Sequence, residues 1–163
     1  MESQSLVHPF PPLVCPESRI LILGSFPSVK SREQQFFYGH PQNRFWRLLA
    51  RVYDTKVPET IEEKTALVFA HHLALWDSVG SCTVKGSSDA SIRDVVPNDL
   101  SRVFSVAPIE RILLNGSLSG KTYQRYLEAK TGIPGLVMPS TSPANAAFSL
   151  ERLAEIWGPY LRV

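Results

Sequence analysis

The feature that most constrains the fold of this chain is a set of four short apolar runs that show no polar/apolar alternation. They are RILIL at 19–23, LALW at 73–76, RILL at 111–114 and LVM at 136–138. A strand with one face in water alternates polar and apolar residues, whereas a strand covered on both faces is apolar along its length. The four runs therefore predict the central strands of a buried parallel sheet.

Segments with helical periodicity lie between and after these runs. Residues 43–53 carry apolar side chains at the spacing that forms one stripe along a helix. Thr60 with Glu63 predicts a capping box, and Gly132 predicts the end of the helix that begins near Ser117. The predicted caps or first residues of the helices are Asn43, Thr60, Pro97, Ser117 and Ser149.

The order of these strands and helices predicts an α/β fold, a three-layer α/β/α sandwich with a central four-stranded parallel sheet and right-handed crossovers. We expect residues 1–163 to form one domain, with residues 1–17 as a partly ordered lead-in. In such a fold, ligands bind beyond the carboxyl ends of the strands. The loops that follow the strands are therefore the first place to look for function.

Composition excludes several classes of protein. Seventeen basic against fifteen acidic residues leave the chain nearly neutral, so any contact with nucleic acid must be local. Cys15 and Cys82 are too few and too far apart for a zinc or iron–sulfur site, and we expect no metal and no cofactor. The sequence has neither a secretory signal nor a run of the ~18 apolar residues that span a membrane. We expect a soluble monomer in the cytoplasm, associated with the nucleoid in a prokaryote.

The loops that follow the four predicted strands are rich in Gly, Ser, Pro and Asn. They cover residues 24–43, 77–91, 115–120 and 139–149. Small polar residues let backbone N–H groups approach a ligand closely and leave hydroxyl groups free for phosphate oxygens. These loops are therefore suited to a nucleic-acid backbone even though the chain carries little net charge.

The first of these loops is about twenty residues long, against roughly six for an ordinary strand-to-helix loop. It carries four aromatic residues, Phe26, Phe36, Phe37 and Tyr38. Aromatic side chains in a long loop suggest stacking against a flat ring. The alternative is that they plug the loop onto the core, which we expect of at least one among Phe36, Phe37 and Tyr38.

Three motifs in the loops resemble those of a known family. GSFPS at 24–28, YGHPQNRFW at 38–46 and PSTSPANA at 139–146 look like the uracil-DNA glycosylase superfamily, in matching order. Their form is most similar to the hypoxanthine (deoxyinosine) DNA glycosylase branch, with the mismatch-specific uracil-DNA glycosylases next. The resemblance implies a monofunctional hydrolase that flips out a deaminated base, above all hypoxanthine, from double-stranded DNA and starts base-excision repair.

The resemblance also assigns roles to individual residues. Most of the superfamily carries a catalytic Asp or Asn where this chain has Phe26, and the hypoxanthine branch is similar in lacking it, so the catalytic role passes to Asn43. Tyr38 takes the place of the aromatic that stacks on the base. The implied base-binding residues are Gly24, Ser25, Phe26, Pro27, Ser28, Tyr38, Trp76 and Asp77. The implied DNA-binding residues are His40, Ser117, Ser140, Thr141, Ser142, Pro143, Ala144 and Asn145.

The expected mechanism relies on orientation rather than on proton transfer. Asn43 has no titratable proton, but its carbonyl oxygen can hold a water against C1′ as the sugar cation develops. Asp77 can accept a hydrogen bond from the N1–H of the flipped base. A lyase step would need a buried lysine with a lowered pKa, whereas Lys30, Lys85 and Lys121 all lie in polar surroundings in the sequence.

Several less specific interpretations remain open at this point. Asn43 can be only the cap of its helix, Asp77 only a turn residue, and 140–145 only a turn before the last helix. His40, His71 and His72 lack a carboxylate that would complete a metal site. Ser25 and Ser142 stand in no GxSxG motif, so a serine hydrolase is disfavoured.

Three alternative functions also remain. The first is a uracil or thymine mismatch glycosylase, and the second is an inactive DNA- or nucleotide-binding module on the same scaffold. The third, a Rossmann-like nucleotide or cofactor enzyme, is disfavoured because GSFPS matches neither GxGxxG nor a P-loop.

Overall fold

The structure is a computed structural model, which describes residues 4–84 and 92–162. Two features of the sequence interpretation fall on the other residues. Lys85 lies outside the described part of the chain, as do residues 86–91 of the second predicted loop.

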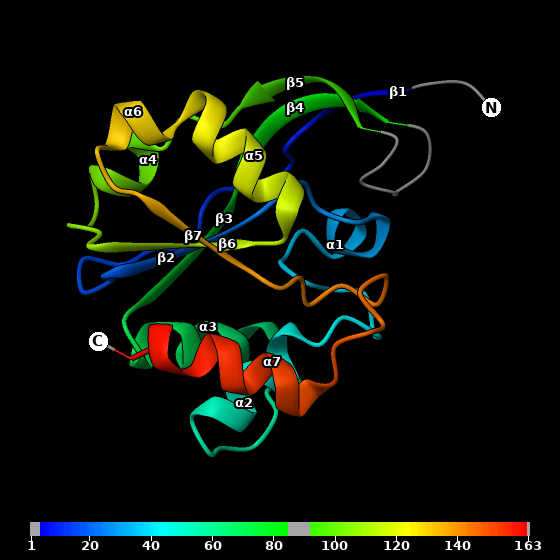
Figure 1. The fold of residues 1–163 in the computed structure, drawn as a ribbon, viewed down its shortest axis with the longest axis vertical. Helices are drawn as coiled ribbons and strands as arrows, with labels where there is room; N and C mark the ends of the chain where they lie inside the picture. The colour runs from blue at the N-terminus through cyan, green and yellow to red at the C-terminus, as the bar shows by residue number, and fades with distance from the viewer. Residues whose placement is uncertain (1–3, 85–91, 163) are drawn as a thin grey trace.

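The core of the fold is a four-stranded parallel sheet, as the four apolar runs predict (Figure 1). Its strands, in spatial order, are β3 (Leu73–Asp77), β2 (Ile20–Gly24), β6 (Arg111–Asn115) and β7 (Gly135–Met138). Every residue of β2 and β3 is buried. The register pairs Gly24 with Asp77 and Asn115 with Met138, so these residues lie together at the carboxyl edge.

Helices cover both faces of this sheet, which confirms the predicted three-layer sandwich. Figure 1 shows α4, α5 and α6 on one side and α2, α3 and α7 on the other. The apolar stripe of α7 buries Leu153 and Trp157 completely, and α5 buries Tyr123. The helices are α1 (Val29–Gln34), α2 (Phe45–Val52), α3 (Ile61–Ala70), α4 (Ser101–Phe104), α5 (Ser117–Tyr126), α6 (Glu128–Thr131) and α7 (Leu150–Trp157), followed by the 3-10 turn η2 (Gly158–Tyr160).

A second, antiparallel sheet was not predicted. It has the order β1 (Gln4–Val7), β4 (Val79–Val84), β5 (Arg93–Pro97). The prediction that the chain after the second apolar run is only a loop was wrong. β4 is rich in small and polar residues, and its pairing with β5 shifts register twice, so its pattern is that of a loop until a partner strand is present.

The lead-in is also more ordered than predicted, because it pairs with the body of the protein. Leu13 and Leu75 exchange two backbone hydrogen bonds of 2.9 Å, and His8 N donates to Gly80 O at 2.7 Å. These bonds place the segment after β1 beside the carboxyl end of β3.

The predicted helix ends were confirmed in part, and the cap predicted at Asn43 was wrong, because α2 begins at Phe45 and its cap residue is Arg44. The Thr60 capping box and the Ser149 cap are both present. Pro97 ends β5 rather than opening a helix, because its fixed φ also suits a strand end, and α4 begins at Ser101. The cap of α5 is Gly116, at a φ of 97° that favours glycine, instead of Ser117.

Alanine substitutions at two glycines test how tightly α5 packs on the parallel sheet. A Cβ at Gly135 in β7 would lie 2.5 Å from Leu114 Cδ1 and 2.8 Å from Tyr123 Cδ2. We expect Gly135→Ala to lower the free energy of unfolding by about 1–3 kcal/mol, because the Tyr123 ring of α5 and the Leu114 side chain must move away from β7. Urea denaturation measures this.

The matched control is Gly158→Ala. A Cβ there meets nothing within 4 Å, and the helical φ of −50° suits alanine. This variant should be neutral or slightly stabilising. Equal destabilisation by both substitutions would contradict the packing of α5 on β7.

Candidate active site

The carboxyl edge of the parallel sheet brings Gly24, Asp77 and Asn115 together from three strands. A Cβ added at Gly24 would lie 2.4 Å from Asp77 Oδ1 and 3.2 Å from the Tyr38 hydroxyl. Only glycine leaves room for both groups. Gly24 therefore lies at the centre of a polar cluster that the first loop completes with Tyr38.

Tyr38 is held by its neighbours in an unusual position. Its φ is 53°, in the left-handed region, and its ring stacks on Phe45 with centroids 4.0 Å apart. Its hydroxyl is buried, and no described residue meets it at hydrogen-bond distance and geometry, although the Asn115 amide lies nearby. Burial, and next the negative charge of Asp77, raise the pKa of Tyr38 far above its ordinary value, against a smaller lowering by the Asn115 amide, so the phenol stays protonated.

The other aromatic residues of the first loop have structural roles. Phe36 and Phe37 are buried in the main core, so they plug the loop onto it, as the alternative interpretation expected. Phe26 packs with the second sheet, against Val79, Cys82 and Val84. A phenyl ring can occupy the position that usually carries Asp or Asn because the unpredicted sheet provides an apolar surface there.

Asn43 is connected to the sheet edge through Thr141. Thr141 Oγ1 donates to Asn43 Oδ1 at 2.8 Å and accepts from Asn115 Nδ2 at 3.1 Å. Asn115 Oδ1 accepts in turn from the backbone N–H of Thr141 at 3.0 Å. Thr141 is completely buried, so this chain of hydrogen bonds is shielded from water. It fixes Asn43 relative to the end of β6.

The same contacts decide which part of the Asn43 amide is available. Oδ1 accepts from the backbone N–H of Phe45 at 2.9 Å as well as from Thr141. A backbone N–H can only donate, so the amide cannot be flipped, and both lone pairs of Oδ1 are engaged. The expectation that this carbonyl holds the attacking water is therefore corrected. The group that Asn43 offers to a substrate is its Nδ2 amide, a donor.

Asp77 has a partner that sequence reasoning missed. His8 Nε2 lies 2.7 Å from Asp77 Oδ2, and the two side chains are only 3% and 6% exposed. His8 follows β1 in the segment that was expected to be a lead-in, 69 residues away from Asp77. Only the pairing of β1 with β4 brings the two together.

The remaining predicted base-binding residues surround the cluster at Gly24 and have structural contacts of their own. Trp76 is 2% exposed and packs in the core, and its Nε1 donates to the backbone carbonyl of Phe10 at 3.4 Å. Ser28 Oγ accepts from Ser31 N and caps α1. Pro27 is buried, and Ser25 accepts a backbone hydrogen bond from Val79 N. These four residues shape the cluster around Gly24.

The predicted DNA-binding segment 140–145 forms a compact turn. Ser140 Oγ accepts from Ser142 N, and Asn145 Nδ2 donates to Ser140 O. These bonds leave Pro143 and Ala144 exposed at the tip. The segment is therefore a turn, as the simpler interpretation held, and its rigid tip also suits insertion into a base stack.

Arg44 stabilises this turn through hydrogen bonds, a role that the sequence did not predict. Its guanidinium donates to the carbonyl oxygens of Ser142 at 2.9 Å, of Asn145 at 3.0 Å, and of Phe148. The YGHPQNRFW motif contains Arg44, but nothing in the motif indicates that its partners lie about one hundred residues away.

His40 and Ser117, the other predicted DNA contacts, lie at the surface. His40 is half-exposed, with its Nδ1 accepting from Gln42 N, and Ser117 is exposed in the first turn of α5. Both are accessible to a ligand.

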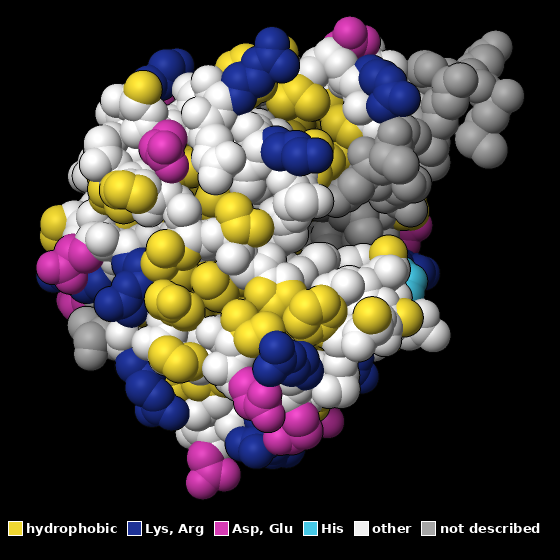
Figure 2. All heavy atoms as spheres, viewed as in Figure 1, with side chains coloured by type: hydrophobic (Ala, Val, Ile, Leu, Met, Phe, Trp, Pro, Cys, Tyr) yellow, Lys and Arg dark blue, Asp and Glu magenta, His cyan; other side chains and the backbone are white. Residues whose placement is uncertain are grey.

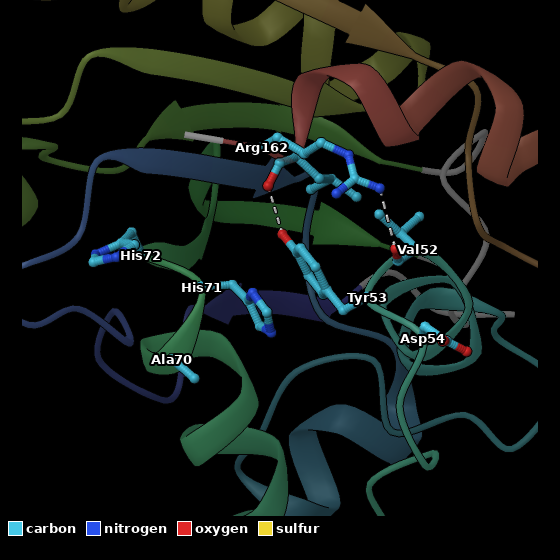
Figure 3. Close-up of a pocket in the computed structure, with 8 residues that line it drawn as sticks. Val52, Tyr53, Asp54, Ala70, His71, His72 and Arg162 are labelled. Atoms are coloured by element: carbon cyan, nitrogen blue, oxygen red, sulfur yellow. Dashed lines mark hydrogen bonds between the residues drawn. The ribbon is translucent and has the colours of Figure 1, made fainter.

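A separate hollow of about 500 Å³ lies at the opposite, amino edge of the sheet (Figure 3). The carbonyl ends of α2 and α3 face it, and these carry partial negative charge that disfavours phosphate. His71, stacked on Tyr53 at 3.5 Å, has its pKa lowered by burial and next by His72, so it offers no positive charge at neutral pH. This hollow is therefore unsuited to DNA.

A cluster of metal-ligating side chains and an apolar helix would indicate metal binding and membrane insertion. Within 4–84 and 92–162, no group of three or more His, Cys, Asp or Glu side chains is arranged to hold a metal ion. No helix in that part of the chain is long and apolar enough to cross a membrane.

Comparisons with known proteins agree with the motifs. A model of the uracil DNA glycosylase superfamily matches residues 11–159. A hypoxanthine DNA glycosylase of Methanosarcina acetivorans is 35% identical over 90% of this chain and 92% of the relative. One of Methanosarcina barkeri is 33% identical over 83% and 86%. A solution NMR structure from M. acetivorans, solved as a candidate uracil DNA glycosylase, superposes with a TM-score of 0.81 at 33% identity, covering 96% of this chain and 98% of that one.

The hydroxyl of Thr141 is the testable centre of the hydrogen-bond chain. We expect Thr141→Val to lower the free energy of unfolding by about 1–3 kcal/mol, because it leaves Asn115 Nδ2 without its acceptor in a buried site. Thr141→Ser keeps the hydroxyl and should lose less. Thermal unfolding of the two variants checks this, and equal losses would contradict the assigned role of the hydroxyl.

Proposed function

This chain belongs to the uracil DNA glycosylase superfamily, and on that premise we propose that it removes hypoxanthine from deoxyinosine in double-stranded DNA by hydrolysis. The product is an abasic site, which starts base-excision repair. We also propose that the protein acts as a monomer in the cytoplasm, at the nucleoid in a prokaryote.

The observation that carries this proposal is the position of Asn43. Thr141 and Asn115 connect it to the carboxyl edge of the sheet, and within residues 4–84 and 92–162 no acceptor is bonded to its Nδ2, which can therefore donate to a substrate. Phe26 is unable to replace it, because a phenyl ring packed on the second sheet offers no polar group. The arrangement agrees with catalysis by an amide outside the first motif.

The reaction begins with extrusion of the damaged nucleotide, since the glycosidic bond is out of reach inside the duplex. The C1′–N9 bond then breaks, and its electron pair leaves with the base while positive charge develops on the sugar. Asn43 Nδ2 donates a hydrogen bond to the departing base and stabilises that negative charge. Water adds to C1′, and its proton ends on the released hypoxanthine.

No lysine is assigned a covalent role. Lys30 faces solvent and lies 3.6 Å from Glu33, and Lys121 is exposed. An exposed lysine remains protonated at neutral pH and does not attack the sugar. Burial lowers the pKa of Lys64, but its Nζ lies 5.3 Å from the centroid of the Trp46 ring, a cation–π contact that favours the protonated form. These contacts support a monofunctional enzyme.

DNA is held by local contacts rather than by a broad basic surface. Figure 2 shows Lys and Arg side chains scattered over one face among acidic and apolar ones. We propose that the 140–145 turn, with Pro143 and Ala144 at its tip, fills the space that the extruded base leaves. The hydrogen bonds from Arg44 to Ser142 O and Asn145 O restrict the movement of this tip.

A panel of duplexes tests the substrate class. Oligonucleotides that carry deoxyinosine, uracil, xanthine or a G·T mispair are incubated with the protein and then treated with alkali, which cleaves abasic sites. We expect strand cleavage mainly at deoxyinosine, and only after alkali. Release of uracil or thymine instead would favour the mismatch glycosylase, and binding without any release would favour an inactive module.

Two substitutions separate a catalytic role of Asn43 from the structural role of its Oδ1, which accepts from Phe45 N and Thr141 Oγ1. Asn43→Asp keeps an oxygen for Phe45 N and Thr141 Oγ1 but removes the amide donor, so we expect wild-type stability and a roughly 100-fold or greater loss of the single-turnover rate. Asn43→Ala should lose the rate and also about 1 kcal/mol of stability. A fully active Asn43→Asp variant would show instead that an acceptor at this position activates water.

A further inference from the structure

A hydrogen-bond donor and an acceptor lie side by side next to Gly24. The Tyr38 hydroxyl and Asp77 Oδ1 both lie within 3.2 Å of the point where a Gly24 Cβ would stand. Asp77 is bonded to His8 through its other oxygen, Oδ2. The Tyr38 hydroxyl is buried and has no partner among the residues that the structure describes. A buried hydroxyl without a partner is costly, and such groups are found where a ligand binds.

This donor and acceptor match one edge of a deaminated purine. Hypoxanthine presents a lactam, in which O6 accepts a hydrogen bond and the adjacent N1–H donates one, and guanine presents the same edge. Adenine presents the reverse, an amino donor beside the N1 acceptor. The protonated Tyr38 hydroxyl can donate to O6, and a carboxylate can accept only from N1–H. Adenine would bring the N1 lone pair against the carboxylate, which is repulsive.

His8 fixes the acceptor of this pair. Its imidazole is enclosed by three aromatic rings, those of Phe10, Phe26 and Trp76, with centroids 4.6, 5.9 and 5.9 Å away. The backbone N–H of Phe10 points at Nδ1, 3.5 Å away. Nδ1 is therefore the acceptor nitrogen, and the proton sits on Nε2, from which it is donated to Asp77 Oδ2. With Oδ2 engaged and the ring immobile, Oδ1 is the oxygen left for the base.

We propose that the Tyr38 hydroxyl and Asp77 Oδ1 read the lactam edge of the extruded base, and that His8 is a positioning residue that holds the carboxylate for this task. The proposal rests on the proposed function and deepens it. Tyr38 then recognises the base through its hydroxyl, in place of the stacking role that the resemblance implies, while its ring is already stacked on Phe45.

The first test is Tyr38→Phe, which removes only the unpartnered hydroxyl. The variant should melt at a temperature close to that of the wild type, because only a longer contact with the Asn115 amide is lost and no internal hydrogen bond. Its single-turnover rate on a deoxyinosine duplex should fall roughly 10-fold or more. A lower melting temperature with an unchanged rate would assign Tyr38 a purely structural role and overturn the proposal.

The second test is a double-mutant cycle between His8 and Asp77. His8→Phe keeps a ring in the aromatic enclosure and removes the donor, and it should slow release of hypoxanthine roughly 10- to 100-fold. His8→Gln should recover part of the rate, since its amide also donates. In an Asp77→Asn background, His8→Phe should change the rate less than about 2-fold. A large further loss in that background would mean that His8 does not act through Asp77.

Two controls keep the outcomes distinct. His71→Phe, at the opposite edge of the sheet, can still stack on Tyr53 and should leave the rate unchanged. The imidazole ¹⁵N signals of His8 should show a protonated Nε2 and an unprotonated Nδ1. This measurement uses the wild type, so it does not depend on the folding of any variant. The opposite tautomer overturns the positioning role. A wild type that releases no hypoxanthine overturns the proposed function, whereas an active wild type matched by His8→Phe overturns only this inference.

Discussion

The close approach of Asp77 to the Cα of Gly24 is the contact on which the site depends. The parallel register places the two residues opposite each other, and the missing side chain of Gly24 lets the carboxylate lie where a Cβ would be. The Tyr38 hydroxyl reaches the same point only because that space is open. One pairing within the sheet thus determines both the position of the acceptor and the position of the donor beside it.

Backbone groups decide what the polar side chains of the site can do. Phe45 N–H fixes the orientation of the Asn43 amide, and Phe10 N–H fixes which nitrogen of His8 carries the proton. The side chain alone does not determine either choice, because an amide can be rotated to exchange its oxygen and nitrogen, and a neutral imidazole can carry its proton on either nitrogen. The proposed catalytic and recognition roles therefore both depend on main-chain donors that lie behind the side chains concerned.

The small antiparallel sheet is part of the functional apparatus. It carries His8 to Asp77, and it provides the apolar surface that accepts Phe26 in place of a catalytic carboxylate or amide. The second sheet thus accompanies both the change of catalytic residue and the added support for the base acceptor. Arg44 donates to carbonyl oxygens of the turn at 140–145, so the segment for which we propose DNA contact is held in place by hydrogen bonds.

The sequence by itself determined the parallel sheet, the helices on both faces, the family and most of the loops that meet at the site. Continuous apolar runs and helical stripes are local patterns, and motifs keep their order along the chain. Tertiary structure alone decided that β1, β4 and β5 form a sheet, that Trp76 is buried, that Asn43 offers a donor, and that His8 supports Asp77. These outcomes depend on partners up to 98 residues apart in the sequence. A hydrogen bond forms only where the folded chain brings donor and acceptor within reach in the right geometry, and a local sequence pattern does not contain that information.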